Sequence, residues 1–401
     1  MTPCRVYRLI LLVTSIALGL RAEVPVASVA NTAVPAAAPA SQAGVLTPEE
    51  IQTLSEQLFP FWTHDESVTV EAGWRGNPLL SSYAATGRAF AGGKLEGFLW
   101  HLPMGGHWEG GAMLDGEVLR YLDPLPGAGG EQHWFLHGDL RWTPVKSLRV
   151  SVSPEIYYFD QVLDLSETAA ARYVLPVKVF GARAKLVVRK SFGGRFAIEA
   201  GGTAGLARYR AIPENYTEPG GLFRVLWTPD PAWTIEGGVE IKRRSYDDRE
   251  ETTAAGRSLL GTRLHFAERS ADLKATRKWT AGGNWEASVK LRAFSNRDEH
   301  AGFYDFNLVG ASGSLEWTRG KWTLDLDVDA NRTHYLVQTV GAGLAPPSRH
   351  GRDIDGTFRV ERSLGKVWSA YAEVEREGSV TNLENAGYRD LIATLGVKRQ
   401  L

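Results

Sequence analysis

The sequence of 401 residues contains one cysteine, Cys4, very near its start. A single thiol forms no internal disulfide, and Cys4 lies in a segment that we expect to be removed. The mature chain is therefore predicted to have neither a disulfide nor thiol chemistry. No cysteine follows the apolar stretch at residues 9–20, so a lipoprotein anchor is not expected either.

The sequence also has no excess of charge of one sign. Lys and Arg number 45 against 46 Asp and Glu, which gives a net charge of -1. Nucleic acid is therefore not expected as a partner. The sequence has no GxSxG, no HExxH and no Gly-rich phosphate loop before a helix. We predict that the protein is not an enzyme and needs no cofactor. A barrel enzyme that gathers its site from separate strands remains an alternative.

Long apolar runs are absent beyond residues 9–20, which fall short of the ~20 residues of a spanning helix. Arg5 and Arg8 precede this run, and Ala22 follows it as a small residue suited to cleavage. This layout predicts a secretory signal peptide over residues 1–22. If the mature protein lies in a membrane, it must cross it with strands.

Two short regions separate the signal peptide from the rest of the chain. Residues 23–46 are mostly Ala, Val, Pro and Ser, which predicts a disordered linker in the periplasm. Thr47, Pro48 and Glu50 then form a helix start with a capping box. We predict a short periplasmic helix and lead-in over 47–65.

From residue 66 onward, apolar and polar residues alternate with period two in stretches of about 10 to 14 residues. In one such stretch, Trp322, Leu324, Leu326 and Val328 alternate with Thr323, Asp325, Asp327 and Asp329. Each stretch predicts a strand with one apolar and one charged face. The predicted strands are 131–143, 147–159, 175–190, 195–209, 220–228, 232–245, 268–279, 284–296, 303–318, 322–336, 353–363, 367–378 and 387–399. Three more fit between residues 66 and 121, for about sixteen (14–18) in all.

The connections alternate in length. Short turns are predicted at 143–147, 192–194, 229–231, 280–283, 319–321 and 364–366. Long polar loops are predicted at 160–173, 211–219, 246–266, 297–302, 337–352 and 379–386. Short turns at one end and long loops at the other are typical of a transmembrane antiparallel β-barrel, with periplasmic turns and extracellular loops.

Large aromatic residues gather beside the short turns. The predicted aromatic girdle consists of Trp142, Trp227, Trp233, Trp279, Trp285, Trp317, Trp322 and Trp368. Amphipathic rings favour a membrane interface, so this set is predicted to mark one. Tyr157, Tyr158, Tyr209, Tyr246, Tyr304, Tyr335 and Tyr388 lie near the long loops and are predicted to form part of a second belt.

Together these features resemble the bacterial outer-membrane β-barrel superfamily, and in size the chain looks like a porin. The resemblance covers residues 66–401 and rests on architecture. It implies a location in the outer membrane of a Gram-negative bacterium, contact with its lipid, assembly by the barrel-insertion machinery and a homo-oligomer. Such chains often end in an aromatic residue, whereas this one ends in Leu401, although alternation continues to Val397.

A soluble β-sandwich, propeller or solenoid is the alternative fold. Strands of soluble proteins average about 5–6 residues, and those predicted here are about twice as long. A propeller repeat of ~40–45 residues carries four strands, whereas the same interval here carries two.

If the apolar faces meet lipid, the charged faces line the interior. The predicted basic pore-lining residues are Arg141, Arg149, Arg183, Lys185, Arg189 and Arg224. The predicted acidic ones are Asp325, Asp327, Asp329, Glu361, Glu373 and Glu375. The two groups fall on opposite walls of a sixteen-strand barrel, where they would orient polar solutes. Alternatively, these charges pair with neighbours and only solvate the wall.

No metal site is predicted. Same-face residues of the Asp325, Asp327 and Asp329 ladder lie ~6.6 Å apart along a strand, too far for all three to bind one Ca²⁺. The predicted function is a porin-like channel for passive diffusion of small hydrophilic solutes. Two alternatives stay open: an accessory barrel or conduit for exopolysaccharide export, and a structural or adhesive surface barrel.

Overall fold

The structure, a computed structural model, describes residues 62–83, 85–102, 107–125, 128–164, 174–210, 212–384 and 386–401. The chain divides into two units, Met1–Phe61 and Trp62–Leu401. The predicted signal peptide, linker and helix lie outside the described residues. Within the part that is described, no helix is long and apolar enough to cross a membrane.

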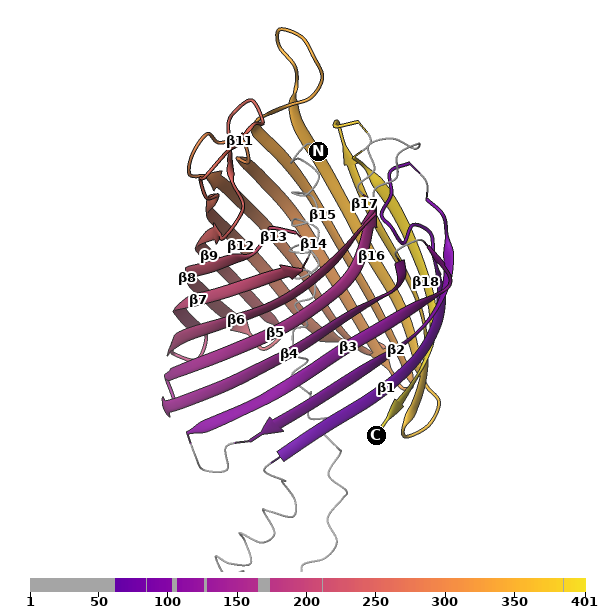
Figure 1. Cartoon of the computed structure of the whole chain (residues 1–401). Coiled ribbons are helices and arrows are strands. Elements are labelled where there is room, and N and C mark those ends of the chain that lie inside the picture. The colour runs from indigo at the N-terminus through magenta and orange to yellow at the C-terminus, as the bar shows by residue number, and fades with distance from the viewer. Residues whose placement is uncertain are drawn as a thin grey trace, which may run out of the picture. The chain divides into compact units, whose positions relative to one another are not determined.

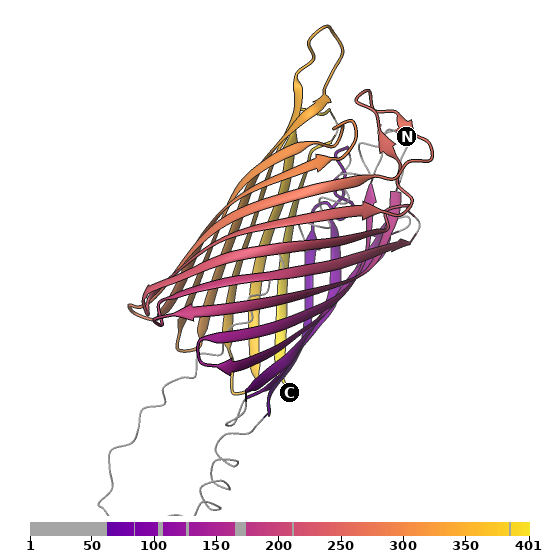
Figure 2. The same cartoon turned by 90° about the vertical axis from the view of Figure 1, so that its left-hand side faces the viewer.

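Sixteen antiparallel strands of the second unit form one closed barrel (Figures 1 and 2). They are β1 (Trp62–Arg75), β2 (Arg88–His101), β3 (Trp108–Leu125), β4 (Ala128–Val145), β5 (Leu148–Asp164), β6 (Val174–Phe192), β7 (Phe196–Arg210), β8 (Tyr216–Asp230), β9 (Trp233–Tyr246), β12 (His265–Thr280), β13 (Asn284–Asp298), β14 (Phe306–Arg319), β15 (Trp322–Thr339), β16 (Ser348–Ser363), β17 (Trp368–Thr381) and β18 (Tyr388–Gln400). Each pairs with its neighbours in the chain, and β1 pairs with β18 to close the sheet. A separate hairpin of β10 (Glu251–Thr252) and β11 (Ser258–Leu259) lies between β9 and β12. The predicted fold class, an all-β antiparallel barrel, is confirmed.

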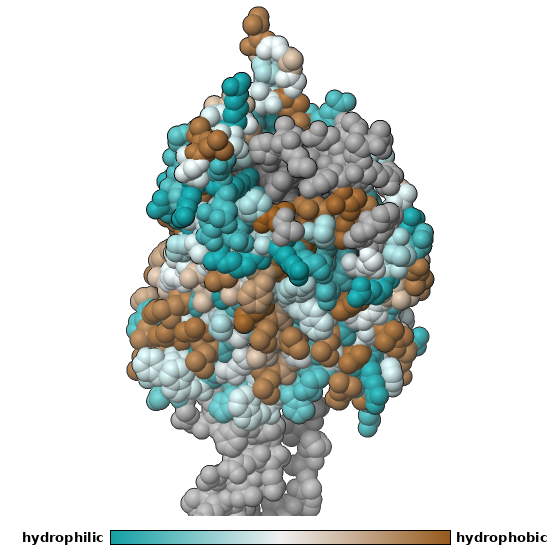
Figure 3. Space-filling view, viewed as in Figure 1, coloured by the Kyte–Doolittle hydropathy of each residue, from teal (hydrophilic) through white to brown (hydrophobic). Residues whose placement is uncertain are grey.

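Strand register places like residues together on each face. Leu326 of β15 lies opposite Phe358 of β16, whereas Asp325 lies opposite Arg359. The apolar side chains face outward, where Leu326 is 40% exposed and Leu395 of β18 is 68% exposed. In Figure 3, apolar residues of the visible face gather in its lower half and hydrophilic ones toward its upper end. The barrel is thus apolar outside and polar inside, because the side-chain period of a strand is two.

The connections follow the predicted pattern. Two residues join β14 to β15, and Gly320 in this turn adopts a φ of 60°, which favours glycine. At the opposite end, residues 247–264 separate β9 from β12 and contain the β10–β11 hairpin. Apart from the two-residue connection between β3 and β4, the long loops therefore lie at the end of the barrel opposite the short turns.

Several strands extend beyond their predicted bounds. β1 begins at Trp62 instead of residue 66, and β15 and β16 reach Thr339 and Ser348 on the loop side. Beyond Val328 the outward positions of β15 carry Arg332 and His334. The apolar–polar alternation is lost there although the backbone hydrogen bonds between the strands continue. The predicted strands are therefore shorter than those in the structure.

The eight girdle tryptophans occupy outward-facing positions beside the short turns. The Trp285 ring lies 5.8 Å from that of Trp279 and 5.9 Å from that of Trp317. Trp142 stacks with Trp108, a further member that the sequence analysis did not include, at 5.8 Å. Neighbouring strands thus bring Trp279, Trp285 and Trp317 into one row and pair Trp108 with Trp142.

The tyrosines near the long loops form no such outward row. Tyr157, Tyr209, Tyr246, Tyr304 and Tyr335 are buried. Tyr246 packs against Tyr216 and Phe266, with ring centroids 5.6 Å apart in each case. Within their strands Tyr157, Tyr209, Tyr246 and Tyr335 alternate with the outward residues and so face inward, whereas Tyr158 occupies an outward position of β5 opposite Trp134. For these four inward tyrosines the prediction of an outward belt is wrong, because the position in the two-residue period, not nearness to a loop, decides the face.

Candidate functional site

The candidate site is the inner wall of the barrel, and the predicted pore-lining residues all occupy inward-facing positions. The basic group comes from β4, β5, β6 and β8, and the acidic group from β15, β16 and β17. Around the barrel, six strands separate β6 from β15 on one side and eight on the other. The structure therefore places the two groups on opposite walls.

Most basic residues have carboxylate partners. Arg141 lies 2.5 Å from Asp139 on its own strand and 3.5 Å from Glu109. Arg149 lies 3.9 Å from the same Glu109 carboxylate. Arg183 lies 3.9 Å from Glu155, and Arg189 lies 3.6 Å from Glu199. The alternative of local pairing therefore describes this wall, whose positive charge is largely neutralised.

The acidic wall is less balanced. Arg359 binds Glu361 at 2.8 Å and Glu373 at 3.5 Å, and Arg292 of β13 lies 3.3 Å from Asp329. Among the described residues, Asp325, Asp327 and Glu375 have no cationic side chain within ion-pair distance. This wall therefore carries an excess of negative charge.

Further acids on this wall were missed in the sequence analysis. Asp353 and Asp355 of β16 and Glu377 of β17 share the inward positions of their strands. The same two-residue alternation identifies them, since they lie within the predicted strands 353–363 and 367–378 and share the parity of Glu361 and Glu375. They increase the negative charge toward the outer end.

Inner aromatic rings lie flat against the wall on glycines of the next strand. A Cβ added at Gly396 would come 2.3 Å from the Tyr371 ring, and one at Gly181 would come 2.0 Å from the Tyr157 ring. The Arg359 guanidinium carbon lies 3.8 Å from the centroid of the Tyr371 ring. Glycine allows this close approach, so these rings cover backbone and do not project into the lumen.

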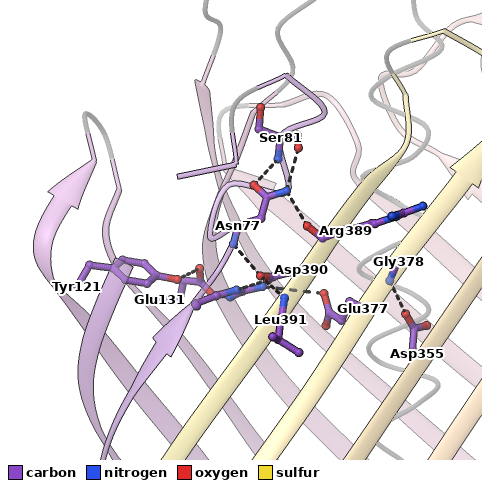
Figure 4. Close-up of polar contacts among 11 residues, drawn as sticks. Asn77, Ser81, Tyr121, Glu131, Asp355, Glu377, Gly378, Arg389, Asp390 and Leu391 are labelled. Atoms are coloured by element: carbon purple, nitrogen blue, oxygen red, sulfur yellow. Dashed lines mark hydrogen bonds and ion pairs between the residues drawn. The ribbon is translucent and has the colours of Figure 1, made fainter. Parts of the chain in front are cut away.

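A buried polar cluster joins the two ends of the sheet near the outer mouth (Figure 4). Arg75 of β1 binds Asp390 of β18 through Nε and Glu131 of β4 through Nη1, each at 2.6 Å. Its Nη2 lies 4.0 Å from Glu377 of β17. The Tyr121 hydroxyl donates to Glu131 at 2.6 Å. One guanidinium thus connects four strands around the closure, and alternation alone did not reveal this.

The loop that follows β1 is fixed on this cluster. The Asn77 amide donates to Asp390 at 2.7 Å, and its Nδ2 donates to the Ser81 carbonyl at 2.8 Å. Leu79, two residues on, is buried against Val162 of β5. The loop therefore ties the closure to β5, which three strands separate from β1.

A second buried cluster fixes the loop at residues 247–264. Arg249 Nη1 lies 2.8 Å from Glu214 Oε2, and its guanidinium stacks 4.9 Å from the Tyr304 ring centroid. The Thr252 and Tyr304 hydroxyls are 3.0 Å apart. Burial raises the pKa of Glu214 from 4.5 to about 7, although Arg249 and Arg244 act in the opposite direction.

Acidification is expected to strengthen the packing of this loop. Because the pKa of Glu214 is higher in the packed loop than in a solvated one, the packed loop binds the proton more tightly. The stabilisation is complete below about pH 4.5 and is lost as the pH rises through 7. Hydrogen exchange of the 247–264 amides, compared with a Glu214→Gln variant at each pH, should show protection that falls from pH 5 to pH 8 only when Glu214 is present. A pH dependence that persists in the variant would contradict this assignment.

Among the described residues, no group of three or more His, Cys, Asp or Glu side chains is arranged to hold a metal ion.

Comparison with known proteins adds a likeness of architecture. No protein-family model matches the sequence, and no curated protein matches it. The chain is similar to an anion-selective porin from Comamonas acidovorans, with 12% identity over 85% of this chain and 99% of that one and a TM-score of 0.46. It is also similar to a BenF-like porin from Pseudomonas fluorescens (10% identity, 85% and 99% coverage, TM-score 0.41). A third is a bacterial polysaccharide outer membrane secretin (12% identity, 84% and 98% coverage, TM-score 0.41).

Proposed function

We propose that this protein is an outer-membrane channel of a Gram-negative bacterium, through which small hydrophilic solutes diffuse passively. One observation carries the proposal: a single closed sheet presents apolar side chains outward and charged side chains inward. Closure pairs the backbone N–H and C=O groups at every strand edge. This pairing is required of strands that lie in hydrocarbon. Barrels of 16 strands are wide enough for an aqueous channel.

The charge of the two walls supports a preference for cationic solutes. The arginines of β4 to β6 are neutralised by neighbouring carboxylates. Asp325 and Asp327 on the opposite wall are not, so a net negative potential faces the lumen. Lumen charges of one sign favour counter-ions in other pores.

The proposal also includes export by a cleaved signal peptide and assembly by the barrel-insertion machinery. The last strand, β18, keeps its outward residues Leu391, Leu395 and Val397 exposed as an insertion substrate requires. Homo-oligomers are part of the same proposal.

Reconstitution of the purified protein in planar bilayers tests the channel and its preference. We expect stepwise conductance and, under a KCl gradient, a reversal potential on the cation-selective side. The Asp325→Asn/Asp327→Asn variant should shift this potential toward zero. Asp160→Asn is the matched control, because Asp160 faces outward and pairs with Lys178 at 2.7 Å.

Two outcomes count against the proposal. A folded wild-type barrel without conductance would contradict the channel and favour an accessory or surface role. An unchanged reversal potential in the double variant would contradict the assignment of charge to the walls.

A further inference from the structure

Charged residues on the outward face are not evenly distributed along the strands. At the outer ends of the strands, outward-facing positions carry basic residues: Arg120, Lys178, Arg208, Arg210, Arg243, Arg269, Arg297, Arg332, Arg352, Arg376 and Arg389. At these outer ends, Asp160 is the one acidic residue among the outward strand positions whose side chains the structure describes. The net charge of -1 therefore conceals a basic outer rim around a mainly acidic lumen.

The rim contains two directly opposed basic pairs, and the pair on β6 and β7 includes Lys178, which binds Asp160 at 2.7 Å. The pair on β15 and β16 consists of two arginines. Arg332 and Arg352 lie directly opposite each other in the register. Cβ atoms of such pairs are about 4.5–5.5 Å apart, and like charges there are destabilising. Both side chains are exposed, and neither forms an ion pair with any residue that the structure describes. An anion between them would remove the repulsion.

A second pair continues the same surface on β17 and β18. Arg376 lies opposite Leu391, and Arg389 lies opposite Gly378, which makes the two arginines diagonal neighbours. Diagonal neighbours are about 7–8 Å apart. Neither has an acidic partner in the described part of the chain.

These four arginines lie at the height along the barrel axis where lipid headgroups are expected. Arg352 and Arg362 are ten residues apart on β16, and Arg389 and Arg399 are ten apart on β18. At ~3.3 Å per residue and a tilt of about 45°, ten residues rise roughly 23 Å, close to the ~25 Å apolar band of a membrane barrel. Exposed Ile354 and Phe358 lie between the two arginines of β16. The rim thus lies at the upper edge of the apolar band.

The two edges of the band differ in what holds their arginines. At the periplasmic edge, Arg362 stacks 5.0 Å from the Trp322 ring and Arg399 stacks 5.5 Å from the Trp368 ring. No described ring lies over Arg332, Arg352, Arg376 or Arg389. The outer set is left open to the membrane.

We propose that Arg332, Arg352, Arg376 and Arg389 form a binding surface on β15 to β18 for a phosphate-bearing lipid of the outer leaflet. Guanidinium groups bind phosphate oxygens in a bidentate manner, so paired arginines suit a headgroup with two negative charges. A lipid fits better than a free anion because the apolar strip directly below, including Ile354 and Leu391, offers contact to its acyl chains. This site goes beyond the proposed channel and does not involve the lumen.

Native mass spectrometry of the full-length mature protein in nanodiscs tests the surface. The nanodiscs contain phosphatidylcholine alone or with phosphatidic acid, whose phosphomonoester is the probe. A membrane-surface arginine that is free to contact a headgroup contributes about a fivefold gain in affinity for anionic lipid, so Arg332→Gln/Arg352→Gln should retain phosphatidic acid roughly 30-fold less well than wild type. The matched control is Arg362→Gln/Arg399→Gln at the periplasmic edge, which should retain it as wild type does.

Further measurements distinguish a lipid site from a site for a free anion and from a purely structural role of the arginines. Inorganic phosphate should not displace the lipid, and displacement would overturn a lipid site in favour of a free-anion site. Arg332→Lys/Arg352→Lys should recover part of the retention. In phosphatidylcholine alone the glutamine variant should be at least as heat-stable as wild type, because a like-charge pair is gone, and its conductance should be unchanged. Equal retention by wild type and the glutamine variant, or an equal loss in the control, would overturn the proposal.

Discussion

Replacing Arg75 by methionine is expected to lower the free energy of unfolding of the barrel by about 3–5 kcal/mol. Arg75 is 8% exposed and holds the carboxylates of Asp390 and Glu131, each at 2.6 Å. Methionine keeps most of the side-chain volume but removes the only cation that, among the described residues, forms ion pairs with both carboxylates. Two or more buried carboxylates then lose their partner, and this uncompensated charge accounts for the expected cost.

Urea titration of the folded band on semi-native gels measures this effect. Arg120→Met is the control, because Arg120 is exposed on the outward face of β3. Its unfolding free energy should change by no more than about 0.5 kcal/mol. Arg75→Lys should recover part of the loss. If Arg75→Met and Arg120→Met unfold alike, the cluster does not stabilise the closure.

The large effect at Arg75 reflects the way in which the barrel closes. β1 pairs with β2 along its whole length, from Trp62 to Arg75, but with β18 only from Ser67 onward. Side chains supplement this shorter ladder at two further levels. The Tyr371 hydroxyl of β17 donates to Glu71 of β1. Lys398 of β18 lies 2.5 Å from Glu96 of β2. Polar bonds at three heights therefore join strands that are far apart in sequence.

The alternation of residues predicted the barrel because it reports directly on the two faces of a strand. It identified the strand at residues 322–336 and placed Asp325 and Asp327 on its polar face, in agreement with β15. It failed at the outer strand ends and for Tyr246, where the outward residues are no longer apolar. Hydropathy marks where strands meet hydrocarbon, whereas the ladder itself extends beyond it.

The candidate site was only partly predictable for a different reason. The face of Arg189 follows from its own strand, but its partner Glu199 depends on the register of β6 and β7. The contact between Arg75 and Glu131 depends further on how β1 to β4 curve around the closure. Which charges are neutralised, and hence the sign of the lumen, is therefore decided by tertiary structure and not by local sequence.

Placing arginine at Leu326 should prevent or severely reduce assembly, whereas placing it at the adjacent Asp327 should be tolerated. Leu326 is an exposed outward residue of β15 about midway between Trp322 and Arg332, which lie at the two edges of the apolar band. A midplane arginine on the lipid face costs about 2–4 kcal/mol. Asp327 faces the lumen, where arginine meets water and neighbouring carboxylates.

The two variants differ by one position on the same strand, so strand propensity and distance from the turn are nearly matched. The folded fraction in isolated outer membranes, read from heat-dependent gel mobility, measures the difference, and Val289→Arg on β13 should repeat the result of Leu326→Arg. Equal assembly of the Leu326→Arg and Asp327→Arg variants would mean that the outward face does not meet hydrocarbon. Because the channel, its charged walls and the lipid-binding rim all depend on that one orientation, this comparison tests the premise that they share.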